Sequence, residues 1–229
     1  MAASSTTENL TAESVESQLR AAADEGERSK ILRRMTDDET AVIGVRMATV
    51  FSIAKSHTGM ALDEVERLLA RNEYELRMAA VSVLDFKAQK RRITPDDRRE
   101  LYEVWMRNLD RITTWDYIDR SAPRVVGLYL TNQPRDVLFD LARSTSLWHR
   151  RAAIVASFTL IRSGDLNDPL ALCEILAGDP ERFVQTAVGT ALREIGRVDR
   201  ASLETFLERR GNDLSAEARR TARTAFPRM

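Results

Sequence analysis

The stretch VRMATV at residues 45–50 returns as LRMAAV at residues 76–81, 31 residues further along the chain. Looser copies follow as WHRRAAI at residues 148–154 and FVQTAV at residues 183–188, which begin 35 residues apart. Recurrence at a period of this length is typical of helical solenoids, which are built from antiparallel helix pairs. The small alanines allow two helices to approach closely, while the larger apolar residues fill the stack.

We therefore predict an all-α fold, a HEAT-like repeat α-solenoid of antiparallel helix pairs with a concave face. Helix-start signals support this prediction, and the clearest is Thr94 followed by Pro95, which suits a helix cap and first helical position. The helix that follows is expected to bury Leu101, Val104 and Trp105 at helical spacing. Further helices are expected after Thr11, after Thr40 in a run through Ile53, from Ala61 to Leu69, and at Asn167-Asp168-Pro169, which repeats the start chemistry of Thr94-Pro95.

The composition is that of an ordinary soluble globular protein. The chain has 229 residues, of which 43% are hydrophobic and 31% charged. We expect one domain over residues 10–229, preceded by a disordered tail over residues 1–9. The absence of a long apolar run argues against a membrane span. The single cysteine, Cys173, lies in an apolar helical run and is expected to be a buried thiol in a cytoplasmic protein.

Charge is distributed unevenly, although the formal net charge is zero. Residues 1–86 hold 10 Lys and Arg against 15 Asp and Glu, whereas residues 87–151 hold 14 against 9. The middle third could therefore present a basic surface to a polyanion such as nucleic acid. A solvated, arginine-rich helix face would give the same pattern.

The segment TWDYID at residues 114–119 carries the candidate chemistry. Trp115 and Asp119 are four residues apart, so on a helix their side chains stand on one face. An aromatic plane beside a carboxylate suits a cation, or a sugar ring that gains positive charge. Taken alone, Trp115 would also fit a core position, and Asp119 would also fit a solvated acid or an acid paired with Arg120.

Three elements make the sequence resemble the AlkD family of DNA glycosylases, which remove alkylated purines from duplex DNA. The first is Trp-Asp-x-x-Asp followed by a proline, matched by residues 115–119 and Pro123. The second is Trp-x-x-Arg-x-Ala-Ile, matched by residues 148–154. The third is Phe-x-Gln-Lys-Ala-Ile-Gly-Trp-x-Leu-Arg-Glu, to which FVQTAVGTALRE at residues 183–194 is similar. Their order and separations agree, and the similarity runs from about Thr40 to the C-terminus.

The resemblance implies roles for individual residues. Asp119 stands where the family keeps its catalytic carboxylate, and Trp115 where an aromatic ring packs against the deoxyribose that bears the lesion. Arg151 stands where an arginine grips the DNA backbone near that lesion. Thr190 replaces a second family Trp, which either weakens the site or widens the cleft for a bulkier lesion. The residues expected to contact DNA are Arg46, Trp148, Arg150, Arg151 and Thr190; for Trp148 a core position, and for Arg46 and Arg151 a solvated position, are the alternatives.

The activity that the resemblance implies is hydrolysis of the N-glycosidic bond of cationic N3- or N7-alkylated purines in duplex DNA, without base flipping, as a step of base excision repair. Bulky adducts are a possible substrate because of Thr190. No cofactor and no metal are expected, since the two histidines, His57 and His149, lie far apart in sequence. The protein is expected to be a monomer in the cytoplasm, associated with the nucleoid in a bacterium. Two alternatives stay open: a non-catalytic binder of distorted or branched DNA on the same fold, and a HEAT-like protein-interaction scaffold.

Overall fold

The computed structural model describes residues 10–35 and 40–226. Contacts divide the chain into two compact units, residues 1–111 and 112–229. Within the described residues every named element is a helix, and a single isolated bridge joins Ala41 to Glu73. The predicted all-α helical repeat fold is thereby confirmed. The single domain over residues 10–229 and the concave face stay predictions, and the expected tail over residues 1–9 lies outside the described residues.

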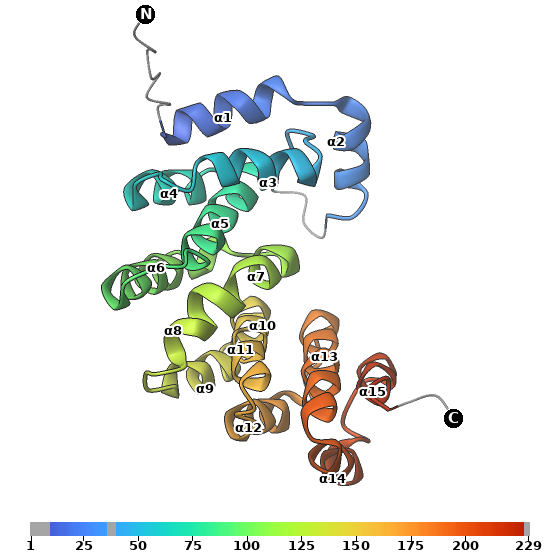
Figure 1. Cartoon of the computed structure of the whole chain (residues 1–229). Coiled ribbons are helices and arrows are strands. Elements are labelled where there is room, and N and C mark those ends of the chain that lie inside the picture. Colours follow the sequence, from blue (N-terminus) through green and yellow to red (C-terminus); the bar gives the residue numbers. More distant parts are fainter. Residues whose placement is uncertain (1–9, 36–39, 227–229) are drawn as a thin grey trace, which may run out of the picture. The chain divides into compact units, whose positions relative to one another are not determined.

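The first unit is organised around one buried helix, α5 (Tyr74–Ala88), which carries the LRMAAV repeat. Helix α5 contacts α1 (Ala12–Ala21), α3 (Met47–Ser56), α4 (Leu62–Leu69) and α6 (Pro95–Arg107). The unit is completed by α2 (Glu25–Leu32) and the 3₁₀ turn η1 (Leu109–Arg111). These helices are drawn from blue to green in Figure 1. Because the repeated stretch supplies small and apolar residues all round α5, this helix can be covered on several sides.

Most of the predicted helix starts in this unit are confirmed. Thr94 caps α6 in a capping box: its hydroxyl accepts from the Asp97 backbone N–H, and Asp97 accepts from the Thr94 backbone N–H. Thr11 caps α1 by accepting from the Ser14 backbone N–H. Trp105 is fully buried, as its spacing predicted.

The predicted helix after Thr40 begins later than the sequence indicated, at Met47. The fully buried carboxylate of Glu75 accepts hydrogen bonds from the backbone N–H groups of Ile43 (2.9 Å), Gly44 (2.8 Å) and Val45 (3.1 Å). Gly44 has a φ of 98°, a left-handed conformation that favours glycine. These contacts hold the segment in a non-helical path, because its donors are satisfied by a side chain 30 residues away.

The second unit stacks its helices in the manner of a repeat. In chain order it contains α7 (Trp115–Ala122), the π-helical turn η2 (Pro123–Gly127), α8 (Leu128–Leu130), α9 (Asp136–Ala142), α10 (Leu147–Ala156), α11 (Phe158–Arg162), α12 (Asn167–Leu176), α13 (Arg182–Val198), α14 (Arg200–Arg210) and α15 (Ala216–Arg223). Helices α7, α10, α13 and α15 contact one another in succession. Helices α9, α12 and α14 flank this row by packing on α10 or α13. Figure 1 shows α13 beside α15 at the C-terminal end of the row.

Small residues permit the close spacing of the row. Ala152 and Ala153 of α10 are buried, as the repeat predicted. A Cβ atom added to Gly189 on α13 would lie 2.7 Å from the Cα atom of Ala218 on α15, closer than real Cβ atoms come. The backbones of α13 and α15 can therefore meet only because residue 189 has no side chain.

The start of α12 differs in its chemistry from the prediction. The helix begins at Asn167 as expected, but Leu166 occupies the cap position and no side chain caps the helix. Asp168 instead accepts from Arg135 at 2.8 Å, and Asp165 pairs with the same guanidinium at 2.6 Å. The expected repetition of the Thr94 start chemistry is thus wrong, because a tertiary ion pair engages the carboxylate.

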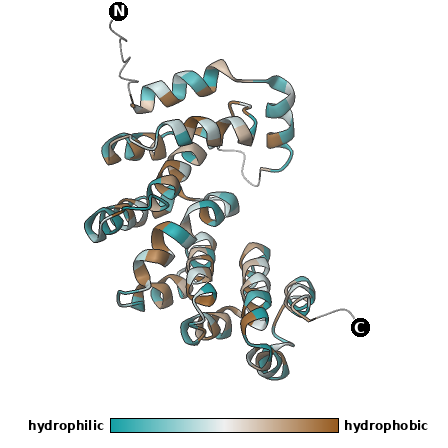
Figure 2. Ribbon diagram, in the orientation of Figure 1, coloured by the Kyte–Doolittle hydropathy of each residue, from teal (hydrophilic) through white to brown (hydrophobic). Residues whose placement is uncertain are grey.

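Hydrophobic and hydrophilic residues alternate along single helices in Figure 2, as in amphipathic helices. Cys173 is fully buried on α12, as predicted. No helix of residues 10–35 and 40–226 is long and apolar enough to cross a membrane.

Candidate functional site

Helix α7 presents Trp115 and Asp119 at the surface of the second unit. The Thr114 hydroxyl caps this helix by accepting from the Tyr117 backbone N–H, which fixes where the helix begins. Tyr117 and Ile118 are fully buried, so the opposite side of α7 faces solvent. On that side Trp115 is 45% exposed, and the Asp119 side chain is 39% exposed. The indole and the carboxylate are therefore both accessible to a ligand.

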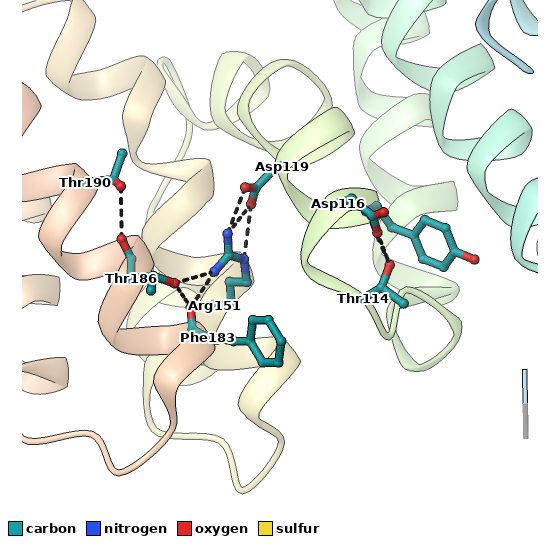
Figure 3. Close-up of polar contacts among 8 residues, drawn as sticks. Thr114, Asp116, Asp119, Arg151, Phe183, Thr186 and Thr190 are labelled. Carbon is teal, nitrogen blue, oxygen red and sulfur yellow. Dashed lines mark hydrogen bonds and ion pairs between the residues drawn. The ribbon is translucent and has the colours of Figure 1, made fainter. Parts of the chain in front are cut away.

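A bidentate ion pair with Arg151 holds the Asp119 carboxylate in place. Arg151, on the neighbouring helix α10, donates from Nη2 to both carboxylate oxygens, at 2.8 Å to Oδ1 and 2.7 Å to Oδ2. Its Nε donates to Oδ1 at 3.1 Å. Figure 3 shows the guanidinium and the carboxylate facing each other across the two helices. Paired hydrogen bonds of this kind fix orientation as well as distance, so the carboxylate has a defined position.

The guanidinium of Arg151 is itself fixed from the far side by α13. Its Nη1 donates to the main-chain carbonyl of Phe183 and, at 3.3 Å, to the hydroxyl of Thr186. The Arg151 side chain is only 7% exposed. Residues of three neighbouring helices are thus linked by hydrogen bonds. The chain of bonds runs from Phe183 and Thr186 on α13 through Arg151 on α10 to the exposed Asp119 on α7 (Figure 3).

Two opposing influences act on the Asp119 carboxyl. Desolvation raises its pKa above the ordinary value for an aspartate, and the nearby charge of Asp116 acts in the same direction. The Arg151 guanidinium lowers it by its charge and by its hydrogen bonds. Desolvation is the larger influence, so the pKa of Asp119 is raised. A carboxylate that is incompletely solvated interacts more strongly with a positive charge brought next to it.

Asp116, the other acid of the motif, has a different place. It accepts from the Thr114 hydroxyl and, at 3.0 Å, from the Tyr117 backbone N–H. Both contacts belong to the first turn of α7, as Figure 3 shows for Thr114. Asp116 therefore stabilises the start of the helix, while Asp119 is the acid that meets Arg151.

Thr190 lies one turn after Thr186 on α13. Its hydroxyl donates to the Thr186 carbonyl at 2.9 Å, and the residue is partly exposed. A threonine that bonds its own helix presents little more than a methyl group to its surroundings. Its predicted contact with DNA stays a prediction.

Trp148 and Arg150, both on α10, make contacts inside the second unit. The Trp148 ring lies 5.3 Å from the Phe183 ring between centroids, tilted by 38°, and is partly buried. Arg150 donates to Asp179 at 2.6 Å and to the carbonyls of Ser144 (3.0 Å) and Thr145 (2.9 Å). These bonds engage most of the donors of Arg150. The predicted DNA contacts of Trp148, Arg150 and Arg151 stay predictions.

Arg46, the remaining predicted DNA contact, belongs to the first unit. It precedes α3 at the cap position, and its side chain is 75% exposed. Its Nε lies 3.5 Å from an oxygen of Glu27. An ion pair with so exposed an arginine contributes little to stability, so the guanidinium is available to other anions.

Thr186 and the Phe183 carbonyl were not singled out in the sequence as parts of the site. Thr186 is four residues before Thr190, a spacing that places both on one face of a helix and could have drawn attention to it. The Phe183 contact uses a main-chain atom, which carries no sequence signal. Within the described ranges, no group of three or more His, Cys, Asp and Glu residues could hold a metal ion.

Known proteins resemble this chain in sequence and in structure. A family model described as "DNA alkylation repair enzyme" matches residues 15–226. Among solved structures, a predicted DNA alkylation repair enzyme from Enterococcus faecalis is similar, with a TM-score of 0.67. The similarity covers 87% of this chain and 94% of that one at 16% sequence identity. At this level of identity it is evidence for a shared fold and for nothing further. No curated protein has a significantly similar sequence.

Proposed function

Since the chain belongs to the DNA alkylation repair enzyme family, and so acts in DNA repair with DNA as its partner, we propose that it is a DNA glycosylase. It hydrolyses the N-glycosidic bond of cationic N3- or N7-alkylated purines in duplex DNA without flipping the base out. One observation carries this proposal. The exposed carboxylate of Asp119 lies on the same face of α7 as Trp115, and Arg151 of α10 fixes its position.

The chemistry of the substrate explains why so few groups suffice. An N3- or N7-alkylated purine carries a positive charge, so it leaves as a neutral base without a protonating acid. As the bond between C1′ and the purine nitrogen breaks, its electron pair moves to the base and the sugar becomes oxocarbenium-like. The transition state therefore needs a negative charge beside the sugar, as in glycoside hydrolysis.

Asp119 supplies that negative charge and a base for water. Its carboxylate stabilises the cationic sugar and orients the water whose oxygen forms the new bond to C1′. The proton of that water passes to the carboxylate or to solvent, and the products are the free base and an abasic site. Arg151 keeps the carboxylate of Asp119 in position. Its positive charge favours the ionised carboxylate and so opposes the increase in pKa that desolvation causes.

Trp115 adds a flat aromatic surface for the sugar. An indole face attracts a cation by about 0.5–2 kcal/mol, depending on how far the pair is desolvated. The 45% exposure of Trp115 in the free protein is unusual for so large an apolar side chain, and binding of a sugar would cover it.

A base-release assay tests the proposal. Purified protein is incubated with duplex DNA that carries a methylated purine or a bulky purine adduct, and the released base is quantified. The wild type is expected to release base, and Asp119→Asn to lower the rate by a hundredfold or so, the usual effect of removing a preorganised electrostatic group. Glu217→Gln is the matched control, because it removes a carboxylate paired with Arg182 elsewhere in the same unit. Wild-type protein that releases no base from either substrate would refute the proposal.

The size of the substrate is a separate part of the proposal. Thr190 stands where the family places a Trp, and its small side chain leaves room for a bulky adduct. We expect Thr190→Trp to keep release from methylated DNA and to lose release of bulky adducts. Release of bulky adducts by Thr190→Trp at the wild-type rate would contradict this assignment.

Thr190 also favours the second candidate, a non-catalytic binder of distorted or branched DNA. Without a second indole, the site has one aromatic wall in place of two. This candidate predicts salt-dependent duplex binding with no base release, with log affinity falling linearly against log salt. We further propose that the protein acts as a monomer in the cytoplasm, associated with the nucleoid in a bacterium.

A further inference from the structure

A cavity of about 290 Å³ lies in the first unit, where α4, α5 and α6 contact one another. The start of α4, from Gly59 to Leu62, forms part of its wall. The C-terminal end of α5, the following loop and the first turns of α6 form the rest. Pockets for drug-sized ligands usually span about 300–1,000 Å³, so this cavity suits one small chemical group.

Three cationic side chains, Lys87, Lys90 and Arg92, line this cavity. In the described parts of the chain, no side-chain hydrogen bond or ion pair engages any of the three. Two arginines of α6, in contrast, are paired: Arg99 lies 3.2 Å from Asp96, and Arg107 lies 3.4 Å from Glu66. The cations of the cavity wall therefore lack the ion pairs that Arg99 and Arg107 form.

The two carboxylates of the wall offset these positive charges only in part. Asp97 accepts from the Thr94 backbone N–H at 3.1 Å in the capping box of α6, and Glu100 is exposed. Lys87, in contrast, is partly buried. Desolvation lowers the pKa of Lys87, the Lys90 charge adds to this effect, and the Asp97 charge opposes it. A partly buried ammonium without a bonded anion destabilises the free protein, and an anion in the cavity would relieve this.

We propose that this cavity binds a phosphate group through Lys87, with Lys90 and Arg92 as flanking contacts. Phosphate accepts several charge-assisted hydrogen bonds at once, from the point charge of a lysine and from the planar fork of an arginine. The group comes either from the DNA backbone or from a free mononucleotide, and both present the same chemistry. The inference does not depend on glycosylase activity, because residues of the first unit alone make the cavity.

A matched pair of substitutions tests the proposal. Lys87→Gln removes a charge from the wall at the end of α5. Arg91→Gln removes a charge from the loop between α5 and α6, at an exposed residue outside the wall. Lys87→Gln is expected to fold, because it removes a charge that burial destabilises. Arg92→Gln, at an exposed position of the wall, provides a second variant with the same expected result.

The first arm measures thermal unfolding in inorganic phosphate or a deoxymononucleotide at constant ionic strength. A rise in Tm with ligand concentration in the wild type and in Arg91→Gln, but not in Lys87→Gln, identifies a free phosphate as the ligand. The second arm measures duplex affinity against salt. A slope of log affinity that falls by about 0.9 in Lys87→Gln, and not in Arg91→Gln, identifies a backbone phosphate. Identical behaviour of Lys87→Gln and Arg91→Gln in both arms would overturn the proposal.

Discussion

Replacement of Arg151 by methionine separates two roles that this residue could have. The substitution keeps an apolar stem of similar bulk in a position that is only 7% exposed. It removes the contacts of 3.1, 2.8 and 2.7 Å to Asp119, together with those to Phe183 and Thr186. Hydrogen bonds to charged groups contribute about 1.5–3 kcal/mol each when buried, but Asp119 is 39% exposed and water can replace its partner. We therefore expect a total loss of about 1–3 kcal/mol in the free energy of unfolding.

The effect on catalysis is expected to be larger than the effect on stability. A catalytic group misplaced by about 1 Å can lower the rate by about a hundredfold. Arg151 also opposes the desolvation that raises the pKa of Asp119, so its removal raises that pKa further. A carboxylate is ionised only above its pKa, and base release therefore falls as the pH drops through it. In Arg151→Met this acid limb is expected to move to higher pH.

Single-turnover base release against pH, together with duplex affinity against salt, measures both effects. Positioning of Asp119 predicts a lower rate and a shifted acid limb, with the salt slope unchanged. The backbone contact that the family resemblance implies predicts a salt slope that falls by about 0.9. Arg182→Met is the control, because it removes an exposed arginine of α13 that pairs with Glu217 of α15. A wild-type rate and acid limb in Arg151→Met would refute the reasoning that Arg151 positions Asp119.

Three further predictions concern Trp115, Gly189 and Cys173. Trp115→Ala should lower base release by about 2- to 30-fold, the rate equivalent of a cation–π contact, and change Tm little because the ring is 45% exposed; an unchanged rate would remove Trp115 from the site. Gly189→Ala should lower the free energy of unfolding in urea by about 1–3 kcal/mol, since its Cβ would lie 2.7 Å from Ala218; unchanged stability would contradict the close contact of α13 and α15. Burial raises the pKa of the Cys173 thiol, so a thiol reagent should label it only on unfolding, and rapid labelling of the folded protein would show that the thiol is accessible.

The sequence predicted those parts of the fold that depend on neighbouring residues. The recurring small and apolar stretch identified buried helices, because the pattern that allows helices to stack is local and periodic. The Thr94 start was predictable for the same reason, since a cap acts over three residues. The start of the helix after Thr40 was not predictable from neighbouring residues. Glu75, about 30 residues further along the chain, satisfies the backbone N–H groups of Ile43, Gly44 and Val45 and so delays the helix to Met47.

The candidate site was only partly predictable for a similar physical reason. Helical spacing placed Trp115 and Asp119 on one face, and the structure leaves both exposed. The pairing of Asp119 with Arg151 joins residues 32 positions apart, so it depends on how α7 packs on α10. The anchoring of Arg151 uses the main-chain carbonyl of Phe183, and every residue type offers such an acceptor.

The central claim is that Asp119 stabilises a sugar that becomes positively charged. Its most direct test compares the affinity of the protein for two duplexes, one with a cationic amine ring at the abasic position and one with a neutral ring of the same shape. Wild type and Glu217→Gln are predicted to bind the cationic duplex a hundredfold or so more tightly, as expected for a transition-state analogue, and Asp119→Asn is predicted to lose this preference. An equal preference for the cationic duplex in Asp119→Asn and in the wild type would contradict the claim.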